Sequence, residues 1–255
     1  MSDFAFSLCL KHRVALVTGV GIGRAAAIAL ARAGAFVGVH FHKSFDGAKD
    51  TLDTIKELGG QGMLLQGDLT DEDQANAVVD QLAMQTGHLD ILFNNAGSPL
   101  RMMPFAEMPL ELWRQVFDVN LTSAFLATKR AVPHLRASGH GAIINNLTLS
   151  MQTGGSGGAA AYAASKGALQ VLTRTLAKEL APAVRTNAIM PGVIETRHHE
   201  VYSTPAKLAD YRKQTPLARN GTAEEVAQAV VFLASDAASF INGAILDING
   251  GRFLR

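Results

Sequence analysis

The sequence predicts a single doubly wound α/β domain built on a parallel sheet. Short apolar segments rich in β-branched residues alternate with longer segments of helical period across the 255 residues, with no linker, repeat or low-complexity tract between them. Parallel strands need long crossover connections, usually helices, so this alternation is typical of a sheet covered on both faces. We therefore treat residues 1–255 as one domain, long enough to bury an extensive core.

Each element follows from its local pattern. Buried strands are expected at 13–18, 35–41, 62–67, 89–94, 141–147, 184–190 and 243–248. Amphipathic helices are expected at 23–33, 46–58, 71–86, 109–137, 157–181 and 222–235. Thr222 and Glu225 have the spacing of a capping box at the start of the last helix. The stretch 193–216 fits the alternation least well, and we expect a helical insertion over a site there.

Composition and charge exclude several classes of function. A formal net charge of +1 without a block of Lys or Arg argues against nucleic-acid and membrane-surface partners. No apolar run approaches the ~20 residues that span a bilayer, and residues 1–13 lack the core of a signal peptide, so a cytoplasmic protein is expected. Cys9 is the single cysteine, so no disulfide within the chain is expected. The adjacent His198 and His199 would point about 100° apart on a helix, so no metal site is expected either.

The stretch VALVTGVGIGRAAAIAL, residues 14–30, has the pattern of a strand, a glycine turn and a helix. Glycines let a backbone approach a pyrophosphate closely, and a helix N-terminus presents unpaired N–H groups to it. The spacing of Gly19, Gly21 and Gly23 is not that of the usual dinucleotide fingerprint, so a plain strand-to-helix turn stays open as the alternative.

A second motif, Tyr162-Ala-Ala-Ser-Lys166, lies in a predicted helix, where positions i and i+4 share a face. A phenol titrates near pH 10, and a cation about 4 Å away contributes around 4 kcal/mol at an effective dielectric constant of 20. Lys166 is therefore of the right strength to bring Tyr162 into the range of proton transfer near neutral pH. Alone, such a pair is more often an ordinary solvated pair on a helix.

Together, five motifs resemble the short-chain dehydrogenase/reductase family in order and separation, from about Lys11 to Gly251. They are the glycine turn, NNAG at 94–97, Asn120 in VFDVNLTSAF, YAASK at 162–166, and NAIMPGVIET at 187–196. The resemblance implies a Rossmann-like domain with a seven-stranded parallel sheet and NAD(P) across the carboxyl ends of the strands. It also implies an enzyme that interconverts a ketone and a secondary alcohol.

The resemblance further implies a role for each matching residue. Tyr162 would be the general acid or base, Lys166 would lower its pKa and hold the nicotinamide ribose, and Asn120 would position a water. Asp68 would meet the adenine, or else only cap the helix that follows. The remaining cofactor contacts implied are Gly19, Gly21, Ile22, Gly23, Leu69, Asn94, Asn95, Ala96, Gly97, Pro191, Gly192, Ile194 and Thr196.

Two positions depart from the family pattern. The serine that usually lies thirteen residues before the tyrosine is replaced by Leu149, which leaves Thr148 and Ser150 as candidates, with Ser150 slightly preferred on residue type. The glycine turn lacks two residues between Gly19 and Gly21, which shortens its reach by up to roughly 7 Å.

The end of the second strand favours NADP(H), with NAD(H) as the alternative. Phe41 stands where an NAD site usually places Asp or Glu, and His42, Lys43 and Ser44 follow it. A 2′-phosphate would meet no carboxylate there and could pair with Lys43, although Lys43 could equally be a solvated surface charge.

The substrate expected is a small or medium ketone or alcohol. His198 and the mixed set of Arg101, Met102, Met103, Met151 and Tyr202 could line its pocket. The resemblance also implies a homotetramer or homodimer, with the helices at 109–137 and 157–181 in one interface. A non-catalytic scaffold with a weakened cofactor site is the rival interpretation, because of the short turn and the displaced serine. Against that rival, Asn120, Tyr162 and Lys166 are all present.

Overall fold

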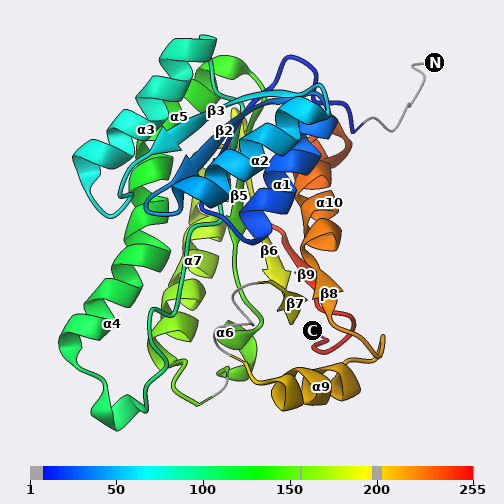
Figure 1. Cartoon of the computed structure of the whole chain (residues 1–255). Helices are drawn as coiled ribbons and strands as arrows, with labels where there is room; N and C mark the ends of the chain where they lie inside the picture. Colours follow the sequence, from blue (N-terminus) through cyan, green and yellow to red (C-terminus); the bar gives the residue numbers. More distant parts are fainter. Residues whose placement is uncertain (1–7, 156, 197–202, 255) are drawn as a thin grey trace.

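A computed structural model gives the structure of the chain and describes residues 8–155, 157–196 and 203–254 (Figure 1). A seven-stranded sheet, parallel throughout, has the strand order β3-β2-β1-β4-β5-β6-β9. Its strands are β1 (Val14–Thr18), β2 (Phe36–Phe41), β3 (Gln61–Gln66), β4 (Ile91–Asn94), β5 (Gly141–Asn146), β6 (Val184–Pro191) and β9 (Ile245–Ile248). The predicted doubly wound fold and its seven strands are confirmed, with strand boundaries within about two residues.

Helices cover both faces of the sheet, and each layer encloses its own core (Figure 1). One layer contains α1 (Ile22–Arg32), α2 (Phe45–Glu57) and α10 (Ala223–Ala234). The other contains α3 (Glu72–Thr86), α5 (Ser123–Ser138) and α7 (Ala160–Glu179). Because both faces are buried, the central strands are almost wholly apolar, and this is why their sequence reads as continuous hydrophobic runs.

The helix predicted at 109–137 is confirmed as a continuous helical stretch, with a π-helical turn inside it that was not predicted. The chain forms α4 (Leu110–Phe117), a π-helical turn η2 (Asp118–Thr122) and then α5. The Asn120 side chain donates to the Val116 carbonyl at 2.7 Å, and so occupies an acceptor one turn earlier in the helix. Such competition from a side chain widens the backbone ladder, and π-turns of this kind often occur at functional sites.

The helical insertion expected within 193–216 is confirmed as α9 (Pro205–Gln214). Thr204 caps it by accepting from the Lys207 N–H, and Pro205 fits the first helical position. Residues His198, His199 and Tyr202 lie outside the described residues. The capping box of Thr222 and Glu225 is also confirmed.

The other elements within the described residues are short. They are η1 (Phe105–Glu107), α6 (Ser150–Thr153), η3 (Asp236–Ala238) and the two-residue strands β7 (Ile194–Glu195) and β8 (Gly221–Thr222), which pair with each other. None of the described helices is both long enough and apolar enough to cross a membrane.

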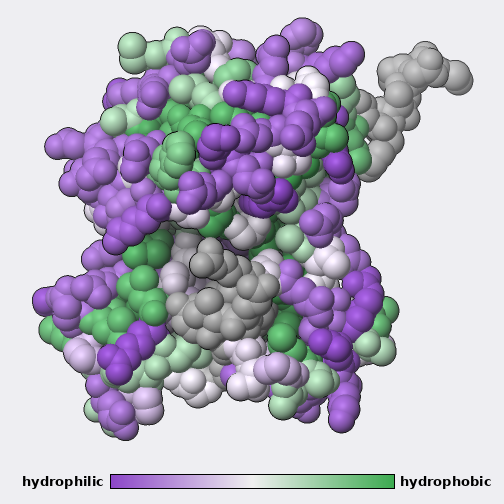
Figure 2. Space-filling model, viewed as in Figure 1, coloured by the Kyte–Doolittle hydropathy of each residue, from purple (hydrophilic) through white to green (hydrophobic). Residues whose placement is uncertain are grey.

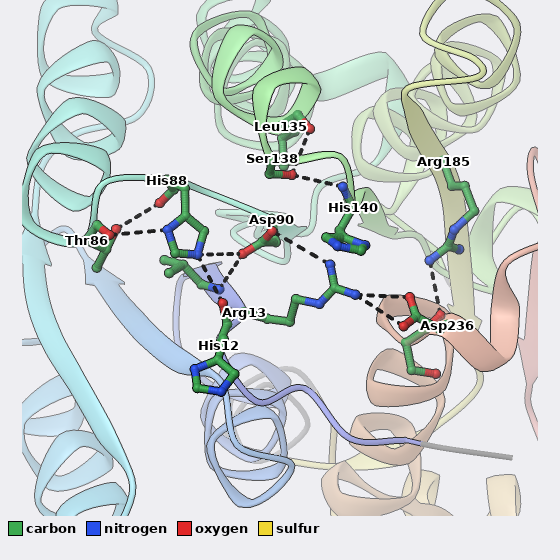
Figure 3. Close-up of polar contacts among 12 residues, drawn as sticks. His12, Arg13, Thr86, His88, Asp90, Leu135, Ser138, His140, Arg185 and Asp236 are labelled. Carbon is green, nitrogen blue, oxygen red and sulfur yellow. Dashed lines mark hydrogen bonds and ion pairs between the residues drawn. The ribbon is translucent and has the colours of Figure 1, made fainter. Parts of the chain in front are cut away.

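A polar network closes the amino-terminal edge of the sheet (Figure 3). Asp90 is 2% exposed and accepts the backbone N–H of Val14 at 2.7 Å. His88 Nε2 lies 3.2 Å from the same carboxylate, and Arg13 lies 3.9 Å from it while also contacting Asp236 on the surface. The carboxylate therefore joins the starts of β1 and β4 to two potential cations.

We predict that Asp90→Asn lowers the free energy of unfolding by about 3 kcal/mol, because Arg13 and Val14 lose a buried charged acceptor. Urea denaturation measures the change. Asp236→Asn is the matched control: its side chain is 73% exposed, so a loss below about 1 kcal/mol is expected. Equal losses in the two variants would contradict the importance of the buried carboxylate.

Candidate functional site

A cavity of about 690 Å³ lies at the carboxyl-terminal edge of the sheet. The space-filling view shows that hydrophilic residues predominate over the upper part of this face of the molecule (Figure 2). Seventeen of the cavity's lining residues run from the glycine turn to the Tyr-Lys motif: Val20, Gly21, Ile22, Asn95, Gly97, Pro99, Met102, Asn146, Leu147, Thr148, Leu149, Ser150, Thr153, Gly155, Ala159, Tyr162 and Lys166. This edge is where open α/β sheets bind their ligands.

The glycine turn is only three residues long, because β1 ends at Thr18 and α1 begins at Ile22. Gly19 and Gly21 have φ angles of 74° and 75°, which only glycine adopts without strain. The Gly19 N–H donates to Nδ1 of His40 at 3.3 Å, and Nε2 of His40 contacts the Gly67 carbonyl at 3.0 Å. A buried imidazole thus joins the ends of β1 and β3 under the shortened turn.

Burial lowers the pKa of His40, so the ring is neutral near pH 7. Because the Gly19 amide needs an acceptor, Nδ1 carries no proton and Nε2 donates to Gly67. His40 therefore accepts the hydrogen bond of a turn N–H that, in a longer loop, could be donated to a ligand.

Asn95 ties the turn to the rest of the site. Its side-chain amide donates to the carbonyls of Thr18 and Val20, at 2.9 and 3.1 Å. Its oxygen accepts from Asn146 Nδ2 at 2.9 Å, and the Asn146 carbonyl accepts from Lys166 Nζ at 2.7 Å. A continuous hydrogen-bonded path therefore connects the glycine turn with the lysine of the Tyr-Lys motif.

Tyr162 is half-buried at the start of α7 and hydrogen-bonds the Thr148 hydroxyl. Burial raises the pKa of Tyr162 to about 12, and the Thr148 bond only partly opposes this. Loss of solvent dominates this shift, and the lowering of the Tyr162 pKa by Lys166 together with a cationic nicotinamide stays a prediction. Thr148, just after β5, thus contacts the phenol, while Ser150 begins α6 on the cavity wall.

Lys166 is 2% exposed, and burial lowers its pKa to about 8. Its ammonium is still mostly protonated at pH 7. The Asn146 carbonyl accepts one of its three protons, which leaves two donors toward the cavity that Lys166 lines.

Asn120 meets Lys166 across Gly97. A methyl group built on Gly97 would lie 2.6 Å from Asn120 Oδ1 and 3.0 Å from Lys166 Nζ. The Asn120 side chain also accepts from the Ser98 N–H and donates to the Ser98 carbonyl, at 3.0 and 2.7 Å. The π-turn therefore fixes Asn120 against the segment that follows β4, and only glycine fits between the two side chains.

The residues expected at the adenosine end lie beside the cavity, at the ends of β2 and β3. Phe41 is 4% exposed and packs in the core against Phe45, so the position carries no charge. His42 Nε2 lies 3.8 Å from Asp68. The remaining expected residues that do not line the cavity are Gly19, Gly23, Lys43, Ser44, Leu69, Asn94 and Ala96.

Asp68 does not cap α3, since Asp71 holds that position and accepts from the Gln74 N–H. Partial desolvation raises the pKa of Asp68. The hydrogen bonds from Thr70 and the charges of His42 and Lys43 lower it by more, so the pKa lies below its ordinary value. The carboxylate is ionised at neutral pH and available as an acceptor.

The opposite end of the cavity is lined by the residues expected around a nicotinamide, namely Pro191, Gly192, Ile194 and Thr196. A methyl group on Gly192 would lie 2.9 Å from the Asn249 α-carbon, so the strand end fits only glycine. With the α1 N-terminus at one end and these residues at the other, the cavity fits a dinucleotide's phosphates and nicotinamide. Of the predicted pocket residues, Met102 lines the cavity, whereas Arg101, Met103 and Met151 do not.

Sequence reasoning missed two groups of residues. His40 and Asn146 hold the turn and the lysine; a histidine inside an apolar strand and a polar residue at a strand end were the available signals. Lys207, Asp210, Tyr211, Gln214 and Arg252 form a polar wall of the cavity, together with Ser203 and Val193. Within the described residues, no cluster of three or more His, Cys, Asp or Glu side chains could hold a metal ion.

Comparisons with known proteins identify the family of the chain. The family model described as "Enoyl-(Acyl carrier protein) reductase" matches residues 17–252. The Escherichia coli protein "Uncharacterized oxidoreductase YgfF" is 36% identical over 94% of this chain and 99% of its own length. The "Cis-4-hydroxycyclohexanecarboxylate dehydrogenase" of Sinomonas cyclohexanicum is 38% identical over 94% of this chain and 96% of its own.

A solved structure carries the same fold with ligands bound. It is 7α-hydroxysteroid dehydrogenase complexed with NADH and 7-oxo glycochenodeoxycholic acid, with a TM-score of 0.91, 34% sequence identity, and coverage of 97% of this chain and 96% of that one. Sequence and fold thus match over nearly the whole chain, and we conclude that it belongs to the short-chain dehydrogenase/reductase family as an NAD(P)-dependent oxidoreductase acting on CH–OH groups.

Proposed function

We propose that the chain interconverts a ketone and a secondary alcohol, with Tyr162 transferring the proton. One observation carries the proposal: Asn120, Thr148, Tyr162 and Lys166, from three separate segments, converge on one cavity or on the glycine that lines it. The nicotinamide cofactor, when bound, supplies the hydride in reduction and accepts it in oxidation. A scaffold protein has no physical need for these four side chains in one place.

Thr148 takes the position of the family serine in this proposal. Its hydroxyl already bonds the Tyr162 phenol, so a carbonyl oxygen placed there would meet two hydroxyl donors. Ser150 lines the same cavity and is the second candidate. The geometry favours Thr148, against the preference for Ser150 that residue type alone gives.

Lys166 and Asn120 support the proton transfer. A phenolate at Tyr162 is favoured by a cation, and Lys166 is held on the same face of α7 by the Asn146 carbonyl. Asn120 Oδ1 lies on the other side of Gly97, where it could hold a water that returns protons to Lys166.

The proposed cofactor is NADP(H). The buried Phe41 replaces the carboxylate that would repel a 2′-phosphate, and His42, Lys43 and Ser44 follow it directly. The competing expectation comes from the solved relative, which is described with NADH. Because His40 already binds the Gly19 N–H, the basic side chains at the end of β2 would have to provide much of the affinity for that phosphate.

We also propose that the chain works as a homotetramer or homodimer. An apolar hollow on α5 and α7 supports this assembly, with Phe125 and Val171 47% and 62% exposed. Ala168 lies in the same hollow and would permit close approach of helices from two copies.

Tyr162→Phe should reduce ketone turnover, followed at 340 nm, at least about 1000-fold, because the phenolic proton donor is lost. Fluorescence titration should show that the variant and the parent bind NADPH with similar affinity, and more tightly than NADH. Substantial residual turnover would exclude Tyr162 as the proton donor. Failure of the parent to bind either cofactor at millimolar concentration would favour the scaffold alternative.

The pH dependence of reduction should follow Lys166. Its ammonium is charged below its pKa of about 8 and neutral above it, so kcat/KM for ketone reduction should be level near pH 7 and fall as pH rises through 8. Lys166→Arg, which keeps its charge, should move the falling limb to higher pH even if kcat is lower. An unchanged limb in that variant would assign the titration to another group.

Gly97→Ala should lower kcat about 100-fold, since the added methyl displaces Asn120 and Lys166 from their positions. The matched control is Gly167→Ala on α7, where an added methyl has no atom within 4 Å. The control should keep its activity and unfold at a slightly higher urea concentration, because alanine favours the helix by roughly 0.5–1 kcal/mol. If Gly97→Ala is as active as the control, the proposed contact between the two side chains has no catalytic role.

A further inference from the structure

The wall of the cavity formed by α9 and the C-terminal segment carries two cations. Lys207 and Arg252 both line the cavity and are both partly buried, although long basic side chains are usually well exposed. Figure 1 shows α9 running beside the C-terminal end of the chain, which brings the two residues together from positions 45 apart in sequence.

Tyr211 organises this pair. The Arg252 guanidinium lies 4.3 Å from the centre of the Tyr211 ring, and Lys207 Nζ lies 5.8 Å from it. Arg252 Nη2 also donates to Gln214 Oε1 at 2.9 Å. The ring and the Gln214 oxygen both restrain the guanidinium, and its other N–H groups stay free to bind a carboxylate with two bonds.

Within the described part of the chain, neither cation has a carboxylate partner. Arg130 and Arg219 each pair with a carboxylate, at 2.6 and 2.5 Å. Among the residues that the structure describes, no carboxylate lies within 4 Å of the Lys207 ammonium or the Arg252 guanidinium. Asp210 shares the wall, but its carboxylate accepts from the Gln214 amide at 2.6 Å.

We propose that this wall binds the carboxylate of the substrate, which makes the chain specific for oxo acids and hydroxy acids. The inference rests on the proposed function, since the reacting carbonyl would lie at Tyr162 while the acid group lies at Lys207 and Arg252. Pro99, Met102 and Leu149, which line the same cavity, give an apolar surface for the carbon skeleton between them. Two relatives fit this class by their descriptions, one naming a hydroxycyclohexanecarboxylate and the other a bile acid.

The turnover test compares 4-oxocyclohexanecarboxylate with its methyl ester, followed by NADPH oxidation at 340 nm. The two ketones differ at the acid group alone, so the ratio of their kcat/KM values reports recognition of the charge. A carboxylate bound by charge-assisted hydrogen bonds should be preferred at least about tenfold at low ionic strength. Lys207→Gln and Arg252→Gln should each lower this ratio about tenfold through KM, and Arg252→Lys should restore part of it.

Lys213→Gln is the matched control, because Lys213 is exposed on the same helix and does not line the cavity. This variant should keep the parent ratio. Lys207→Gln is expected to fold normally. The Lys207 ammonium makes no hydrogen bond to a described residue, so its removal breaks no hydrogen bond that holds α9. A ratio near one in the parent, or equal ratios in Lys207→Gln and Lys213→Gln, would overturn the proposal.

A binding test separates this inference from the proposed function. Isothermal titration of cyclohexanecarboxylate and cyclohexanecarboxamide, with and without NADP⁺, requires no turnover. Tighter binding of the acid that is lost in Lys207→Gln would support the anion site even if no ketone is reduced. Equal binding of acid and amide, or binding of neither, would overturn the anion site even in an active reductase.

Discussion

The site depends on the way Thr18 and Asn95 fasten the ends of β1 and β4. The Thr18 hydroxyl donates to the Phe93 carbonyl at 3.2 Å and accepts the N–H groups of Asn95 and Ala96, at 2.9 and 3.0 Å. These groups lie where the strands stop and the ladder no longer satisfies the backbone, so each would be costly to bury unpaired. From this junction, hydrogen bonds lead from Asn95 to the glycine turn on one side, and through Asn146 to Lys166 on the other.

The shortened glycine turn is held in place by His40, which bonds the Gly19 N–H and the Gly67 carbonyl. The register pairs Thr18 with His40, which places the imidazole directly beside Gly19. A neutral ring that accepts from one strand end and donates to another stabilises a turn too short to bond to itself. The cavity consequently keeps its nicotinamide end, while the phosphate end has fewer backbone donors than a longer loop would provide.

Much of the fold could be predicted, because buried parallel strands appear as short apolar runs and the helices that cover them appear as segments of helical period. The Tyr162 and Lys166 pair could be placed on one helix face for the same reason. The π-turn could not be predicted, since the helical period does not reveal that the Asn120 side chain takes the Val116 carbonyl and bonds Ser98 from another segment. The direction of the Tyr162 pKa shift could not be predicted either, because it is set by how far the folded chain removes the phenol from solvent. The contact of His40 with Gly19 could not be predicted, because it depends on the register between β1 and β2, which a local sequence pattern does not contain.

The two polar networks lie at opposite ends of the same strands. Asp90 and Arg13 hold the amino-terminal edge, whereas Thr18 and Asn95 hold the edge that bears the cavity. The wall with Lys207 and Arg252 belongs to neither, since it is built from an inserted helix and the end of the chain. Evolution can therefore revise substrate preference by redrawing that wall while the framework and the proton-transfer residues stay as they are, which is one physical route by which a single scaffold diversifies into many enzymes.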